Sequence, residues 1–178
     1  MRGPLFRAPL FQGPEALIVR QRIFGESNPE AAFSVTSLAQ TLAWQGRLNE
    51  AESLLSEAYR KVAAALGPEN PRVAGVALDL ARVRIERGGA AGVESLVRPA
   101  LAVRQRMYPS GYWRVAEAQA LLGASLAAQR RDDEAEPLMV AADQVFKPIP
   151  GRQGRDRDAN RVRLDLLRHQ RIAARPRD

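Results

Sequence analysis

The chain repeats its own pattern with a 42-residue period, and this period constrains the fold more than any other feature. The residues that recur at this spacing are mostly apolar or small, and one acid also returns in each copy. The clearest columns are Leu38, Leu80 and Leu122; Ala39, Ala81 and Gly123; Ala58, Ala100 and Ala142; and Glu52, Glu94 and Glu136. Such a period is typical of stacked helical units rather than of one globular core. At least about three units are needed to bury the faces between them, and the chain holds about three and a half.

Within each unit, apolar residues at intervals of three and four predict two helices. The expected first helices cover 30–45, 72–87 and 113–129, and the expected second helices run between Asn49 and Gly67 and over 91–107 and 133–146. No stretch shows the strict alternation of a strand. Because the connections are short, consecutive helices should pack antiparallel.

Several residues mark the ends of these helices. Gly46 and Gly67 are expected to end a helix each, because glycine takes a positive φ without a steric penalty. The expected capping pairs are Asn49 with Glu52 and Asp133 with Glu136, which have the spacing of a capping box. Pro99 falls inside the helix expected over 91–107, so we predict a kink or a late start there.

The ends of the array are less regular than its middle. Residues 15–24 resemble a second helix that has no first helix before it. An oligomer formed through this unpaired helix is therefore one of the alternatives to a monomer. Leu164 follows Leu122 by one repeat period and predicts a last first helix over 157–173. The expected organisation is an irregular segment at 1–14, a repeat array at 15–146 (a partial unit at 15–25 and repeats at 30–67, 72–108 and 112–146), a linker at 147–155, and a capping helix with a basic tail at 156–178.

The formal charge of +7 is unevenly distributed. The segment from Lys147 to Asp178 holds ten basic and four acidic residues, a net charge of +6, so the chain before Lys147 carries only +1. A nearly neutral body has no broad field that would attract a polyanion. The chain has no cysteine, no apolar run of about 20 residues and no secretory signal at its start, so we expect a soluble, cytoplasmic protein with no membrane contact.

These residues resemble tetratricopeptide repeats, in the 42-residue form of kinesin light chains and many bacterial proteins. The first helix of that pattern has a Leu followed by Gly or Ala, and the second helix has small and large apolar residues in turn. The matching residues are Leu38-Ala39, Leu42, Ala51, Leu55 and Ala58; Leu80-Ala81 and Ala100; and Leu122-Gly123, Leu126, Ala135, Met139 and Ala142. The segment from Tyr112 to Ala124 is similar to the last repeats behind some bacterial serine/threonine kinase domains. The resemblance implies an all-α, right-handed α-solenoid of antiparallel helix pairs.

The resemblance also implies a concave groove lined by the first helices, which binds a peptide or protein segment. The expected lining residues are Phe33, Ser37, Gln40, Trp44, Asp79, Arg82, Glu86, Glu117 and Leu121. Their mixture of an indole, amide and carboxylate acceptors and a guanidinium suits an extended peptide, whose backbone needs donors and acceptors. The Asn pair that often grips the peptide backbone in this family is replaced here by Thr36-Ser37, Leu78-Asp79 and Ala120-Leu121.

The sequence offers no pattern for catalysis. It has one histidine, His169, and lacks nucleophile-elbow, phosphate-cradling and dinucleotide-binding motifs, so we expect neither enzyme activity nor a cofactor or metal. The predicted function is a non-catalytic protein-interaction scaffold, with bacterial signalling as the context that the resemblance implies. The alternative is binding of nucleic acid or an acidic partner through the Arg-rich segment from Arg152 to Arg177, which offers no aromatic residue for base stacking.

Overall fold

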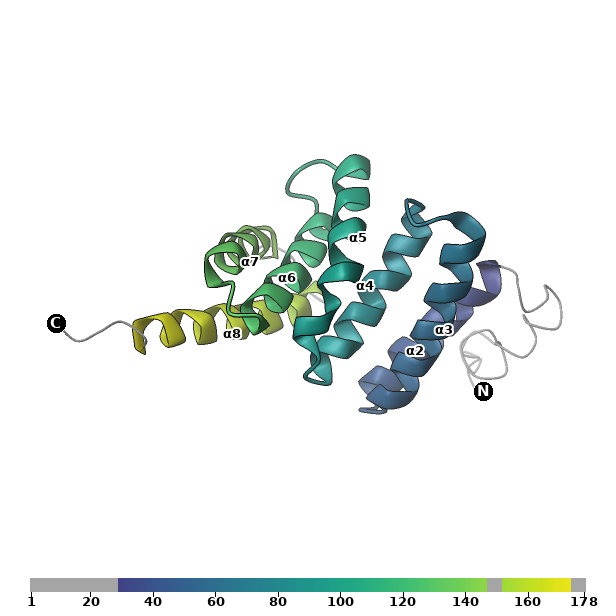
Figure 1. The fold of residues 1–178 in the computed structure, drawn as a ribbon, viewed down its shortest axis with the longest axis horizontal. Helices are drawn as coiled ribbons and strands as arrows, with labels where there is room; N and C mark the ends of the chain where they lie inside the picture. The colour runs from purple at the N-terminus through teal and green to yellow at the C-terminus, as the bar shows by residue number, and fades with distance from the viewer. Residues whose placement is uncertain (1–28, 147–151, 174–178) are drawn as a thin grey trace, which may run out of the picture.

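The computed structural model describes residues 29–146 and 152–173, which form a row of helices (Figure 1). The helices are α2 (Pro29–Trp44), α3 (Leu48–Leu66), α4 (Pro71–Glu86), the 3₁₀ turn η1 (Ala90–Val93), α5 (Glu94–Met107), α6 (Trp113–Ala128), α7 (Asp132–Phe146) and α8 (Arg152–Ala173). No strand occurs within these ranges. The predicted all-α repeat solenoid is confirmed. No helix in the described ranges has both the length and the apolar character needed to cross a membrane.

The helices pair as α2 with α3, α4 with α5, and α6 with α7, and each helix packs against the next along the chain. The first helices of successive units also contact one another, in the order α2, α4, α6 and α8. By contrast, the backbones of the described second helices α3, α5 and α7 do not come into contact with one another. The first helices therefore lie on the tighter, inner side of the stack, and we call this side the first-helix face.

The recurring columns of the sequence form the core between the helices. The most deeply buried columns are Ala51, Val93 and Ala135; Leu55, Val97 and Met139; and Ala58, Ala100 and Ala142, each residue no more than 3% exposed. The column of Ala39 and Ala81 ends in Gly123, where an added Cβ would lie 2.6 Å from Cγ of Met139. The repeat period thus reflects one packing arrangement that occurs three times.

In two units a glycine with a positive φ ends the first helix, and in the third unit an arginine takes its place. Gly46 and Gly67 both have φ of +79°, as expected for residues that end a helix. Gly88 stands one period after Gly46 and has φ of +89°, but the third unit has Arg130 at this place, with φ of +63°. An arginine therefore adopts a left-handed conformation that favours glycine.

The predicted capping pairs are wrong. Helix α3 begins at Leu48 and its N-cap is Arg47, so Asn49 lies in the first turn of the helix. Helix α7 begins at Asp132, which likewise places Asp133 inside the helix. Arginines of the following first helix bind both acids, Glu52 and Glu136.

Two further boundaries differ from the simplest expectation. The 3₁₀ turn η1 precedes α5, so this α-helix starts late, at Glu94, which leaves Pro99 in its second turn. Helix α8 starts at Arg152, within the linker expected over 147–155. Pro150 is the last proline before Pro176, so every residue between them keeps the backbone donor that a helix needs.

Helix α8 packs against α7 and α6 through its apolar residues. Leu164 and Leu167 are buried, and the fully buried Asn160 donates its Nδ2 hydrogen to the carbonyl of Met139 at 2.8 Å. The predictions for 1–14, for the helix at 15–25, for an oligomer formed through that helix and for the residues after Ala173 lie outside the described residues.

Candidate binding groove on the first-helix face

A cavity of about 190 Å³ opens on the first-helix face, between α2, α4, α6 and α8. We call it the groove. The sequence-predicted residues that line it are Gln40, Trp44, Asp79, Arg82, Glu86, Glu117 and Leu121. Residues that are distant in the sequence, such as Gln40 and Leu121, therefore meet in one cavity because the units stack in register.

A chain of polar contacts crosses the groove from α2 to α6. Gln40 donates its Nε2 hydrogen to Oδ1 of Asp79 at 3.1 Å, and Arg82 forms an ion pair with the same oxygen at 3.8 Å. Arg82 also donates to Oε1 of Glu117. The side chains of Asp79, Arg82 and Glu117 are only 18%, 20% and 15% exposed. These charges are therefore largely withdrawn from water, where electrostatic interactions are stronger than at an open surface.

Apolar groups surround this polar chain. Leu55 and Leu121 are buried residues that contribute to the wall, and Trp44 is 59% exposed at the end of α2. The groove thus combines an accessible indole with fixed hydrogen-bond donors and acceptors. This composition suits a peptide, because the indole can contact an apolar side chain while the polar chain contacts the backbone.

Two predicted lining residues stand apart from the other seven. Ser37 is exposed and does not line the groove. Phe33 belongs to α2, but its side chain lies outside the described part of the structure.

Sequence reasoning missed the contribution of α8. Ala159 and Arg163 both line the groove, and each follows a predicted lining residue, Glu117 or Leu121, by one period. The repeat register therefore contains the signal, although the sequence predicts the last helix as a cap or, in the alternative function, as a surface for a polyanion, and not as part of the groove.

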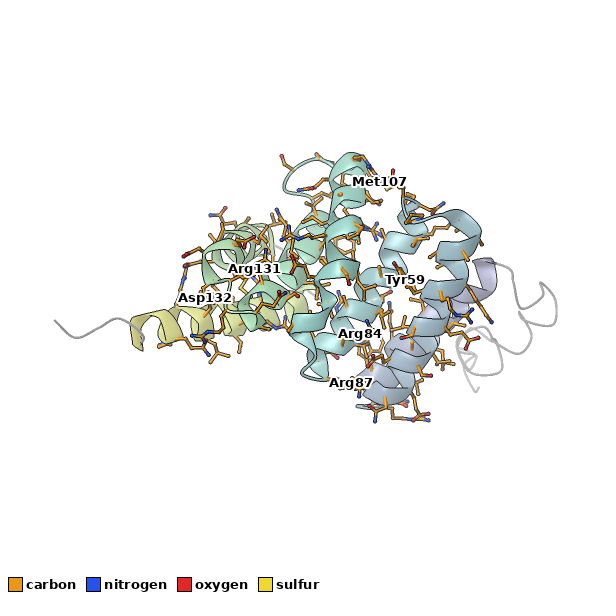
Figure 2. The ribbon with its side chains drawn as sticks, viewed as in Figure 1. Tyr59, Arg84, Arg87, Met107, Arg131 and Asp132 are labelled. Carbon is orange, nitrogen blue, oxygen red and sulfur yellow. The ribbon has the colours of Figure 1, made fainter. Side chains whose placement is uncertain are left out.

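A different set of charged contacts ties successive units together away from the groove. Glu52 of α3 accepts a hydrogen bond from Nε of Arg84 at 3.0 Å and is also bound by Arg87, which follows α4 directly. Figure 2 labels these two arginines toward the lower edge of the array, with Met107 at its upper edge. Burial raises the pKa of Glu52, but the hydrogen bonds from Arg87 and Arg84 outweigh it, so the pKa lies below its ordinary value.

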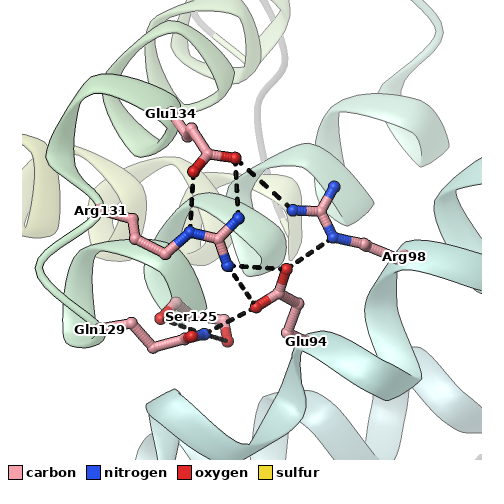
Figure 3. Close-up of polar contacts among 6 residues, drawn as sticks. All are labelled: Glu94, Arg98, Ser125, Gln129, Arg131 and Glu134. Atoms are coloured by element: carbon pink, nitrogen blue, oxygen red, sulfur yellow. Dashed lines mark hydrogen bonds and ion pairs between the residues drawn. The ribbon is translucent and has the colours of Figure 1, made fainter.

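The corresponding tie in the next unit is more extensive (Figure 3). Glu94 accepts hydrogen bonds from Gln129 at 2.9 Å, from Arg98 at 2.6 Å and from Arg131 at 2.8 Å. Arg131 also forms an ion pair with Glu134 at 2.8 Å. The hydrogen bond from Gln129, followed by those from Arg98 and Arg131, lowers the pKa of Glu94 to about 2.

The same contact occurs a third time, where Arg168 of α8 donates to Glu136 at 2.9 Å. Because Glu52, Glu94 and Glu136 are each one period apart, we call these three contacts the unit ties. Each tie joins the start of one second helix to the end of the next first helix, or to the turn after it. Their position and pairing indicate a structural role.

The arginines of the basic segment do not form one open basic surface in the described part of α8. Arg157 pairs with Asp158, Arg161 with Asp143 and Arg168 with Glu136. Arg163 lines the groove instead. Within the described residues, no group of three or more His, Asp or Glu side chains is placed to hold a metal ion.

One stretch of the chain matches a known family, and the fold is similar to that of solved structures. Residues 34–72 match the tetratricopeptide repeat family. The fold is similar to the crystal structure of the nearly identical TPR-like repeats of a putative kinesin light chain from Podosopora anserina, with a TM-score of 0.69 and 18% identity over 90% of this chain and 76% of that one. It is also similar to BtubC (BKLC) from P. vanneervenii, with a TM-score of 0.63 and 19% identity over 92% and 73%. No curated protein matches the sequence.

Proposed function

From the tetratricopeptide repeat at residues 34–72 and the all-α solenoid around it, we propose that this protein binds an extended peptide segment of a partner protein in its groove. Proteins with this fold typically serve as non-catalytic scaffolds that bind protein partners. The single observation that supports the groove as the site is that Gln40, Asp79, Arg82 and Glu117, from three first helices, form one polar chain along a cavity beside Trp44.

The groove can satisfy the backbone of an extended segment. A peptide has alternating N–H and C=O groups, and on binding each loses its hydrogen bonds to water. Carboxylates of Asp79 and Glu117 can accept from N–H groups, and the amide of Gln40 and the guanidinium of Arg82 can donate to C=O groups. Trp44 then provides the apolar contact that adds affinity. We expect a micromolar Kd, about −8 kcal/mol, which is usual for a short segment bound in this way.

The test begins with selection of binders from a displayed library of random peptides, using the full chain as the target. Selected peptides are then measured with the Trp113→Phe variant, in which Trp44 is the remaining tryptophan and its fluorescence reports occupancy of the groove. Asp79→Asn should weaken binding of these peptides at least tenfold. The matched control is Glu134→Gln, which removes a carboxylate that pairs with Arg131 of the second unit tie, away from the groove.

Equal binding by the two variants would overturn the proposal, as would a failure to select any peptide. The Asp79→Asn change is conservative in shape, and Arg82 keeps Glu117 as a partner, so loss of folding is not expected to explain a loss of binding.

The finer context that we propose is a bacterial signalling assembly. This rests on the similarity of residues 112–124 to repeats found behind kinase domains. It is tested by identifying the proteins that co-purify with the full chain but are lost with Asp79→Asn.

The alternative function is binding of a polyanion through the basic segment. A contact with about six phosphates would weaken roughly a thousandfold between 50 and 200 mM salt. Deletion of residues 148–178 cannot separate the two functions, because α8 lines the groove and covers α7. The pair of changes Arg157→Gln and Arg161→Gln, which keeps the third unit tie and the groove intact, should weaken polyanion binding and leave peptide binding unchanged.

A further inference from the structure

A second cavity, of about 280 Å³, adjoins the groove at the start of α4. Three arginines from three helices line it: Arg72 of α4, Arg104 of α5 and Arg114 of α6. Asp79 lines both cavities, so they share a wall. We call the second cavity the basic notch.

Arg104 occupies a position that the other units fill with apolar side chains. Val62 stands one period before it and Phe146 one period after it, and they are 1% and 0% exposed. Arg104 is itself only 6% exposed. The second unit thus places a permanent positive charge where the neighbouring units have an apolar core side chain. Burial of a charge without a compensating partner is unfavourable.

Among the described residues, no carboxylate forms an ion pair with Arg104, and its buried Nε hydrogen has no hydrogen-bond partner. The ring of Tyr108 lies 5.8 Å from Cζ of Arg104 and 5.9 Å from Cζ of Arg114. These cation–π contacts hold the two guanidinium groups but leave their charge in place.

Arg84 is a second arginine of this unit that stands where other units have a core residue, and the chain provides a carboxylate for it. Its column holds the buried leucines Leu42 and Leu126 in two other units and Arg168 in α8. Arg84, however, is bound by Glu52 in the first unit tie. Of the two exceptional arginines in this unit, one has a carboxylate partner in the chain and the other lines a cavity.

A glycine keeps this cavity open. Gly75 stands in the column of Phe33 and Glu117, both larger residues, and an added Cβ would lie 3.4 Å from Nη2 of Arg104. A longer side chain at Gly75 would therefore enter the notch.

We propose that the basic notch binds an oxyanion, a carboxylate or a phosphate group, with the guanidinium of Arg104 as the principal donor. A guanidinium presents donors in a planar fork that matches both groups. Asp79 would repel the anion at the shared wall, so the anion lies on the side of Arg104 and Arg114. Since the two cavities adjoin, the anion belongs to an acidic or phosphorylated residue of the segment that lies in the groove, and this last step rests on the function proposed above.

The test of the notch itself needs no peptide. The full chain, labelled with ¹⁵N, is titrated with sodium phosphate and separately with sodium acetate, each against sodium chloride at matched ionic strength. We expect a saturable shift of the Arg104 Nε–H resonance with its midpoint in the millimolar range. The salt with the lower midpoint concentration shows whether a phosphoryl group or a carboxylate is the preferred ligand.

Arg104→Met should weaken binding of the anion at least tenfold. It should not lower the Tm, because it removes a buried charge that has no carboxylate partner among the described residues. The matched control is Arg106→Met on the same helix, where the arginine is exposed and pairs with Glu69. Gly75→Leu is a second variant. It should also weaken binding of the anion at least tenfold, because it fills the notch while keeping all three arginines. The absence of a saturable shift, or an unchanged shift in both Arg104→Met and Gly75→Leu, would overturn the proposal.

The link to the groove is tested with the selected peptides. Replacing the acidic or phosphorylated residue of such a peptide by alanine should weaken binding to the native chain and have no effect on binding to Arg104→Met. Equal effects on both proteins would overturn the link. The free-anion titration reports on the notch and the peptide selection on the groove, so either can fail while the other succeeds.

Discussion

The unit ties and the groove use the same chemistry, charged side chains that bridge successive units, but they differ in how they repeat. Glu52, Glu94 and Glu136 recur in every unit, and each binds an arginine of the following unit. In the groove, by contrast, the column of Asp79 contains Ser37, Leu121 and Arg163, and the column of Gln40 contains Arg82 and Ala124.

The difference indicates two roles. A contact that must hold each unit to the next has the same requirement at every junction, so the same glutamate returns, although the arginines that bind it do not all share one column. A surface that recognises an irregular partner needs different chemistry at each position. In this chain, we infer, recurring columns stabilise the stack and variable columns recognise the ligand.

The largest expected effect concerns a recurring apolar column. Met139 is fully buried, and in its column stand Leu55 and Val97. Met139→Ala should lower the free energy of unfolding by about 2–5 kcal/mol, as is usual for a large core residue replaced by alanine. Urea denaturation measures this. A cost below about 1 kcal/mol would contradict the assignment of this column to the core.

The next effect concerns a variable column of the groove. Glu117→Gln removes the charge that binds Arg82 and one acceptor for the peptide, so affinity for a selected peptide should fall about tenfold, or about 1.4 kcal/mol. The Tm should change little, because Asp79 still pairs with Arg82. Titration followed by Trp44 fluorescence measures the first quantity and calorimetry the second. A large loss of Tm with unchanged affinity would reverse the roles inferred for the two regions.

A smaller effect concerns pH and the second unit tie. The pKa of Glu94 is about 2 in the folded chain and ordinarily 4.5, so the unfolded chain binds more protons between these values. The tie therefore contributes its full stability above about pH 5 and loses it as the pH falls toward the folded-state pKa. Glu94→Gln should be less stable than the native chain at pH 7, and the difference should shrink on acidification. Denaturation curves at several pH values would show this, whereas a constant difference would argue against the tie.

The smallest effect concerns the turn that leads into this tie. Arg130 has a positive φ where two other units have glycine, so Arg130→Gly should stabilise the fold by about 1 kcal/mol. Urea denaturation again measures the change. Destabilisation would mean that the hydrogen bond from Arg130 to Gln170, at 3.0 Å, matters more than the strained backbone.

Much of this architecture could be predicted because it repeats. The columns of Leu80 and Ala81 and the helix-ending Gly46 follow from the sequence itself, whereas the cavity residues on three first helices follow from what the resemblance to tetratricopeptide repeats implies. The same register also points to Arg163, one period after Leu121, and to Arg104, one period after Val62, although neither was identified as a site residue.

Other features depend on contacts that no local pattern reveals. The spacing of Asn49 and Glu52 is that of a capping box, but Glu52 faces two arginines of the next unit, and their attraction determines where it points. Likewise, the sequence places Arg84 and Arg104 in apolar columns, but only the packing shows which of them has a carboxylate partner among the described residues.

The most direct measurement of the central claim is a map of amide chemical shifts on the ¹⁵N-labelled full chain as a selected peptide is added. The account predicts that the perturbed resonances cluster around Gln40, Asp79 and Glu117 and include the indole of Trp44. A cluster around the unit ties, or along the outward-facing arginines of α8, would contradict it.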